Sequence, residues 1–154
     1  MLANAIKKRL NKEEGQKGFT LIELLAVIVI LGIIAVIAIP MIGGIINKSR
    51  ADSNLATARQ FYDAARLYIT AEENGIFANQ DVTLTELTTK GYIDPQTLLP
   101  SNKTQLTNAN VHFDANGQLA NPTNTTTGAV TLYTGSDSAN TFQFPATNIL
   151  KAEN

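Results

Sequence analysis

The hydrophobic pattern divides the chain into four zones. Residues 1–18 are polar and basic, and residues 19–46 are almost entirely apolar. Residues 47–74 are amphipathic with helical periodicity, whereas in residues 75–154 Thr, Asn, Gly and Pro accumulate between short alternating segments. This order predicts one long helix followed by a small head of mixed structure.

The apolar zone has the length of a membrane span. Leu24–Ile46 carries no charged residue over 23 positions. As a helix it would extend about 35 Å, enough to cross a hydrocarbon core of roughly 30 Å. A cleaved secretory signal would have a shorter apolar core of about 7–15 residues that leads to a small-x-small cleavage site. This run is longer and has no such site, so a membrane-spanning helix is the better interpretation.

The helix is expected to continue beyond the apolar zone. Apolar positions beyond Asn47 step by three and four, which makes one stripe on a helix: Leu55, Ala58, Tyr62, Ala65 and Ile69. The pair Asn74-Gly75 is a suitable C-terminal stop. A helix from about Thr20 to Glu73 would measure roughly 80 Å. Pro40 and Gly43-Gly44 lie inside it and predict a kink or a locally melted turn.

The head has the signals of one short helix and two hairpins. Thr83–Glu86 has the spacing of a capping box, and Gly91 is placed to end the helix that follows. Turn residues separate two pairs of alternating segments: 111–113 with 118–120, and 129–134 with 141–144. The expected sheet would present an apolar face for the helix stripe to cover: Leu119, Val130, Leu132, Phe142 and Phe144. The predicted fold class is therefore α+β, a long kinked N-terminal helix packed on a small antiparallel sheet.

Charge gives the helix an orientation. The formal net charge is −1, but residues 1–18 sum to +3 and the remaining 136 residues sum to −4. A basic end beside an apolar span places that end on the cytoplasmic side, so the head faces outward. Because no basic or aromatic face accompanies the positive end, we expect no direct nucleic-acid site.

Catalytic and metal-binding patterns are missing from the sequence. The chain has no cysteine and a single histidine, His112, within a short predicted strand. Loop aspartates (Asp81, Asp94, Asp114 and Asp137) lack the spacing of a calcium loop. Nothing resembles a nucleophile elbow, a phosphate loop or a pair of catalytic acids. The sequence therefore predicts a protein that is not an enzyme and needs no cofactor or metal.

One charged residue lies at the start of the apolar run. Glu23 is flanked by Leu21, Ile22, Leu24 and Leu25. A carboxylate inside a membrane costs a few kcal/mol and normally has a partner. From the physics alone, Glu23 could equally lie at the lipid headgroup boundary, where it is partly solvated.

The segment Lys17-Gly18-Phe19-Thr20-Leu21-Ile22-Glu23-Leu24-Leu25 resembles the processing site of type IV prepilins and type II secretion pseudopilins. The resemblance covers roughly residues 15–70. It implies that residues 1–18 are a leader, that a prepilin peptidase cuts between Gly18 and Phe19, and that the new N-terminus of Phe19 is methylated. It also implies that Glu23 pairs with the amino terminus of an adjacent subunit during assembly, and that Pro40 is the helix-breaking proline of the family.

The resemblance implies a biological role and partners as well. The chain would be a filament subunit that starts as a single-pass protein of the cytoplasmic membrane and ends in a filament at the cell surface. Its partners would be other copies of itself, the prepilin peptidase, an assembly platform protein and cytoplasmic ATPases. Such filaments serve adhesion, motility, secretion or DNA uptake. The lack of cysteine favours a Gram-positive source. The alternative is a monomeric, membrane-anchored surface-binding module that does not polymerise.

Overall fold

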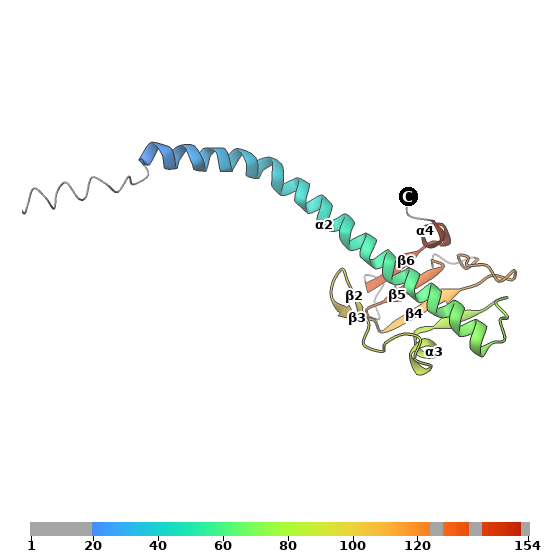
Figure 1. The fold of residues 1–154 in the computed structure, drawn as a ribbon. Coiled ribbons are helices and arrows are strands. Elements are labelled where there is room, and N and C mark those ends of the chain that lie inside the picture. Colours follow the sequence, from blue (N-terminus) through green and yellow to red (C-terminus); the bar gives the residue numbers. More distant parts are fainter. Residues whose placement is uncertain (1–19, 124–127, 136–139, 152–154) are drawn as a thin grey trace, which may run out of the picture. The chain divides into compact units, whose positions relative to one another are not determined.

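A computed structural model describes residues 20–123, 128–135 and 140–151. The predicted leader, Gly18 and Phe19 therefore lie outside the described residues. The elements follow in the order α2 (Leu21–Glu72), β1 (Asp81–Thr83), α3 (Leu84–Thr89), β2 (Leu98–Leu99), β3 (Thr104–Gln105), β4 (Asn108–His112), β5 (Val130–Tyr133), β6 (Thr141–Phe144) and α4 (Ala146–Leu150) (Figure 1). The fold is α+β with an antiparallel sheet, as predicted.

Helix α2 is 52 residues long and begins and ends within one residue of the predicted bounds. Its stop is also as expected: Asn74 (φ 54°) and Gly75 (φ 74°) adopt left-handed conformations. The carbonyl of Ile69 accepts hydrogen bonds from the N–H groups of Glu73 and Gly75, at 3.1 and 2.9 Å. These bonds satisfy a carbonyl that would otherwise lack a partner at the helix end.

The helix continues through the position where a melted turn was expected. Residues 39–44 are helical throughout, with Pro40 inside α2. A Cβ added to Gly43 or Gly44 would meet nothing within 4 Å. Of the two expectations, a kink or a melted turn, the melted turn is not found in the structure.

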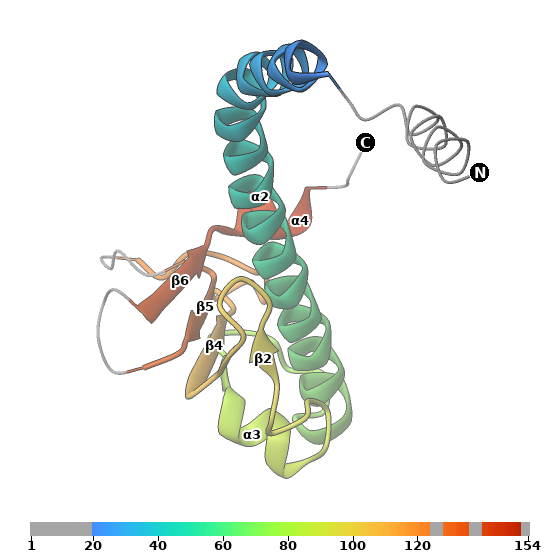
Figure 2. The same ribbon diagram turned by 90° about the vertical axis from the view of Figure 1, so that its left-hand side faces the viewer.

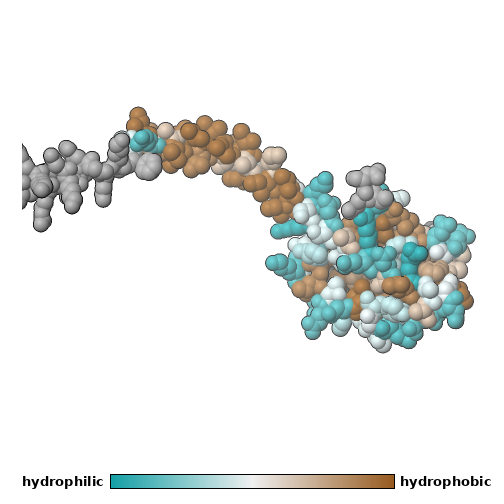
Figure 3. Space-filling model, viewed as in Figure 1, coloured by the Kyte–Doolittle hydropathy of each residue, from teal (hydrophilic) through white to brown (hydrophobic). Residues whose placement is uncertain are grey.

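The apolar zone and the head form two compact units, Met1–Ile45 and Ile46–Asn154. In the described part of the first unit, large apolar side chains are exposed almost without interruption, from Leu21 (85%) to Ile45 (60%). Figure 3 shows this part of α2 as a nearly uniform hydrophobic surface. The helix has the length and composition of a membrane span.

The main sheet of the second unit has four strands in the order β1-β4-β5-β6, all antiparallel. The predicted hairpin of β5 and β6 is confirmed, with Leu132 opposite Phe142. The other predicted hairpin is only partly correct. Its turn forms, but the second arm is reduced to one bridge between Phe113 and Leu119. Strand β4 pairs instead with β1 and β5, and its apolar residues Ala109 and Val111 are buried.

The second half of α2 lies against this sheet (Figure 2). Phe61, Ala65 and Ile69 are completely buried and belong to one core with Val111, Leu132 and other strand residues. Three residues of the predicted stripe are buried in this core, and the other two, Leu55 and Tyr62, are partly buried and pack against it. Asn54 and Thr57 are buried as well. The buried face of α2 is therefore centred on Phe61 rather than on the predicted stripe. Phe61 is the bulkiest side chain that α2 places in the core.

The capping box and the short helix α3 form as predicted. The Glu86 carboxylate accepts hydrogen bonds from the N–H and the hydroxyl of Thr83, at 2.7 and 2.8 Å. Gly91 follows the helix with φ 78°. By contrast, the two-residue strands β2 and β3 were not predicted. They form a separate small sheet between α3 and β4.

Candidate functional site

The candidate site lies at the start of α2, where Thr20 and Glu23 form a second capping box. The N–H and the hydroxyl of Thr20 both donate to Oε2 of Glu23, each at 2.8 Å. The N–H of Glu23 donates in return to the hydroxyl oxygen of Thr20, at 3.3 Å. This reciprocal pattern satisfies N–H groups of the first helical turn that have no partner within the helix. A carboxylate is also favoured at this position by the positive end of the helix dipole.

The two oxygens of the Glu23 carboxylate have different surroundings. Oε2 accepts the bonds from Thr20, whereas Oε1 accepts no hydrogen bond from any residue that the structure describes. The side chain is exposed, and so are its neighbours Ile22 (72%) and Leu24 (60%). The site therefore presents one unused carboxylate oxygen on an otherwise apolar helix. A cation or an N–H donor from another molecule is the group that would satisfy it.

The structure does not bring the predicted site residues together. Glu23 and Pro40 lie on the same helix, about 25 Å apart along its axis. Gly18 and Phe19 fall outside the described residues. Thr20 was not singled out from the sequence, although Thr20–Glu23 has the same T-x-x-E spacing as the recognised box at Thr83–Glu86. That spacing is the signal that could have identified it.

His112 and the loop aspartates have structural surroundings. The Nδ1 atom of His112 on β4 lies 2.7 Å from a carboxylate oxygen of Asp81 on the neighbouring strand β1. Asp94 and Asp114 bind main-chain N–H groups of their own turns. Within the described ranges, no group of three or more His, Cys, Asp or Glu residues is placed to hold a metal ion. Asp137 lies outside those ranges.

The start of α2 is similar in sequence to known proteins. Residues 15–39 match the family described as the prokaryotic N-terminal methylation motif. Fimbrial protein Q of Moraxella bovis is 43% identical over 79 residues, which cover 49% of this chain and 50% of that protein. The type IV major alpha-pilin of the same organism is 51% identical over 53 residues, or 32% of this chain and 33% of that protein. The N-terminal part of the chain is therefore similar to type IV pilins.

A secretion-system protein is similar over the same part of the chain. Type II secretion system core protein G of Pectobacterium carotovorum subsp. carotovorum is 33% identical over 81 residues, covering 53% of this chain and 51% of that protein. The chain spans about half the length of two of these relatives and a third of the other. No solved structure matches it. The expected Gram-positive source finds no support in these matches, whose organisms are M. bovis and P. carotovorum.

Proposed function

We propose that this pilin-like chain is a structural subunit that polymerises into a filament at the cell surface, and that it is not an enzyme. The observation that carries the proposal is the start of α2. An exposed apolar helix carries a single carboxylate, Glu23, and one oxygen of it accepts no hydrogen bond from the described residues. An apolar helix of this kind suits lipid before assembly and other copies of itself afterwards.

The proposed processing supplies a partner for that carboxylate. Cleavage between Gly18 and Phe19 by a prepilin peptidase creates a positive amine at Phe19, only four residues from Glu23. Both charges are costly in hydrocarbon, and pairing the amine of one subunit with Glu23 of the next would neutralise them. Buried ion pairs give register more reliably than net stability. The pair would therefore set the axial position of each subunit.

The other parts of the proposal concern location and the role of Pro40. The precursor is a single-pass protein of the cytoplasmic membrane, with residues 1–18 inside, residues 19–46 in the membrane and the rest of the chain outside. An assembly platform protein and ATPases move it into the filament, which serves adhesion, motility, secretion or DNA uptake. Pro40 lets the helix open locally when copies pack together. A filament structure with unbroken helical hydrogen bonds over residues 39–44 would contradict this last step.

The replacement of Glu23 tests the assembly mechanism. Glu23→Val keeps the span apolar, so membrane insertion should be unchanged, while sheared surface filaments should fall at least about tenfold because a charged partner loses its counter-charge. Glu23→Asp is the matched control that keeps the charge on a shorter side chain, and it should retain more filaments than Glu23→Val. Normal filament yield from Glu23→Val would refute the pairing.

Processing is tested separately by mass spectrometry of the mature protein. We expect the chain to begin at a methylated Phe19. A mature chain that retains Met1, or that starts at another residue, would instead favour the monomeric membrane-anchored module.

A further inference from the structure

The head carries an excess of opposite charge at its two ends, although Asp52 lies among the cations of one and Lys90 among the carboxylates of the other. Cations gather around the first turns of α2 in the second unit. Asn54 on α2 exchanges hydrogen bonds with Ser101, at 2.9 and 3.2 Å, which brings the turn containing Lys103 to this end. The guanidinium of Arg59 donates to the carbonyl of Lys151, at 2.9 Å, and so brings α4 there too. We call this region the basic end: Lys48, Arg50, Arg59, Lys103 and Lys151.

Carboxylates gather around the other end of α2. The C-terminal end of α3 is joined to α2 by the ion pair of Lys90 with Glu72. The N–H of Asn79 donates to the carbonyl of Asp114, at 2.8 Å, and so places the turn after β4 beside the segment that follows α2. We call this region the acidic end: Glu72, Glu73, Asp81, Glu86 and Asp114. Arg50 and Glu73 are separated by about 35 Å along the helix axis.

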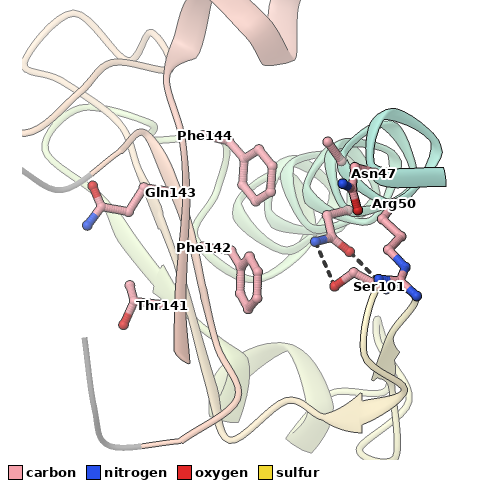
Figure 4. A pocket seen from close by; sticks show the side chains of 9 residues that line it. Asn47, Arg50, Ser101, Thr141, Phe142, Gln143 and Phe144 are labelled. Carbon is pink, nitrogen blue, oxygen red and sulfur yellow. Dashed lines mark hydrogen bonds between the residues drawn. The ribbon is translucent and has the colours of Figure 1, made fainter. Parts of the chain in front are cut away.

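The basic end contains a groove of about 420 Å³ between α2 and the edge strand β6. Figure 4 shows the half-buried rings of Phe142 and Phe144 pointing from β6 toward the helix, while Gln143 points away. Arg50 lines the helix side of the groove. Its guanidinium makes no hydrogen bond or ion pair with any residue in the described part of the chain. The groove therefore offers an apolar floor beside an unpaired positive charge.

The acidic end carries a projection of matching chemistry. Ile76 follows the stop of α2 and is 60% exposed. Glu73 lies three residues before it. The two N–H bonds to the carbonyl of Ile69 and the left-handed residues at 74 and 75 fix this loop. The loop thus presents an exposed isoleucine beside a carboxylate on a well-defined turn.

We propose that the groove at the basic end binds the loop Glu73–Ile76 of a second copy of this chain, with Ile76 against Phe142 and Phe144 and Glu73 opposite Arg50. This inference rests on the proposed polymerisation and assigns one contact within it. The two surfaces lie at opposite ends of one unit, so the contact is heterologous and need not close. Repetition of the contact would add copies in a line, which is the geometry of a filament.

Charge favours a second copy over lipid as the occupant of the groove. Anionic headgroups would satisfy the basic end, as juxtamembrane cations commonly do. They would leave Glu73 and the exposed Ile76 without a partner from another molecule. A second copy satisfies both ends with one contact, and complementary potentials also steer subunits together.

A charge swap tests the proposal in the full-length chain expressed in its assembly system. Arg50→Glu and Glu73→Arg should each reduce sheared filaments about tenfold or more, because each places like charges opposite one another. The double variant Arg50→Glu/Glu73→Arg should restore filaments, since each contact then has the reversed pair. Asp63→Arg is the matched control on an exposed position of α2, and its yield should stay within about twofold of wild type.

Several outcomes of the swap would overturn the inference. The inference would be overturned if the single variants Arg50→Glu and Glu73→Arg assembled as well as wild type. If Arg50→Glu and Lys48→Glu reduced filaments equally and the double variant gave no rescue, the basic end would act on lipid instead. Wild-type chains that form no filaments would count against the proposed function itself.

Crosslinking gives a second readout that does not depend on the yield of charge variants. The chain has no cysteine, so a designed pair has no background. Oxidation of filaments carrying Asn47→Cys and Asn74→Cys should produce a ladder of dimers and higher multimers, because a disulfide requires the Cβ atoms to lie about 3.5–4.5 Å apart. Ala56→Cys with Asn74→Cys, which moves one thiol to an exposed position that does not line the groove, should remain monomeric. A monomeric Asn47→Cys/Asn74→Cys chain would overturn the proposed contact.

Discussion

At the scale of single residues, Asp114 holds the turn after β4. Its Oδ1 atom accepts hydrogen bonds from the N–H groups of Gln118 and Asn116, at 2.9 and 2.8 Å. These bonds, chiefly the one from Gln118, hold the pKa of the carboxyl below its ordinary value. Gly117 completes the turn with φ 76°, and an added Cβ there would lie 2.8 Å from Phe77. The turn therefore depends on the ionised side chain of Asp114 and on the absence of a side chain at Gly117.

The lowered pKa of Asp114 predicts a pH dependence. Because the folded-state pKa lies below the unfolded one, the carboxylate contributes stability above about pH 4, and this contribution is lost as the pH falls through the lowered folded value. Asp114→Asn keeps an acceptor oxygen but does not titrate, so it should lose less stability than wild type over that range. Urea unfolding of the full chain in detergent at several pH values measures the difference. Equal losses for the two proteins would contradict this assignment.

Residue-level features could be predicted where their signal is local. Glu23 was identified because a charge in an apolar run is visible in the sequence, and the box at Thr83–Glu86 because its spacing is short. The bonds from Thr20 to Glu23 obey the same spacing but were missed, since the apolar run dominated the interpretation. The contact of His112 with Asp81 joins residues 31 positions apart. It depends on the pairing of β1 with β4, which no local pattern reveals.

At the scale of elements, one arginine attaches α4 to α2. Nε of Arg59 donates to the carbonyl of Ile149 at 3.2 Å, and its Nη2 atom donates to those of Asn148 and Lys151, at 3.2 and 2.9 Å. Carbonyls at the end of a helix lack partners within it, and a cation is favoured there. We call these bonds of the Arg59 guanidinium the fork. In a chain without disulfides, the fork fixes α4 to α2.

Replacement of the fork should release α4 alone. Arg59→Lys keeps the charge but cannot reach several carbonyls in a plane, so the N–H of Ile149 should exchange with solvent roughly tenfold to a hundredfold faster. Arg50→Lys, at a position with no partner in the described chain, is the matched control and should leave this rate unchanged. Hydrogen exchange of the full chain in detergent checks both. Unchanged protection in Arg59→Lys would mean that burial of Ile149 holds α4 without the fork.

Elements were predictable in proportion to their length and periodicity. The 52 residues of α2 give many turns of consistent pattern, and the β5–β6 hairpin joins neighbouring alternating segments. Strands β2 and β3 have two residues each, too few for any period to appear. The hairpin after β4 was only partly predicted, because an Asn-Gly turn does not by itself require two full strands. Burial of Val111 between β1 and β5 determined the pairing instead.

At the scale of the whole molecule, the hydrophobic core belongs entirely to the second unit. Its buried apolar residues run from Ala58 to Ile149, and none comes from the described part of the apolar zone. The four tyrosines also lie beyond residue 46, so their fluorescence reports on the head alone. Stability of the head should therefore be independent of substitutions in the apolar half of α2.

Two truncations to alanine test this independence. Phe61→Ala removes a completely buried ring and should lower the free energy of unfolding of the head by about 3–5 kcal/mol. Ile30→Ala removes a 56% exposed side chain of the apolar half and should change it by less than about 0.5 kcal/mol. Both are measured by urea unfolding in detergent, followed by tyrosine fluorescence. A large effect of Ile30→Ala would show that the two units unfold together.

The proline inside α2 also has a mechanical consequence. A pull on the two ends of this helix is carried by its successive backbone hydrogen bonds, and the turn at Pro40 has one bond fewer than the others. That turn should yield first. Each residue that passes from helix to extended chain would increase its rise along the axis from about 1.5 Å to about 3.3 Å, and the subunit would lengthen accordingly. A subunit of this design would stretch at one defined point under load while its head stays folded.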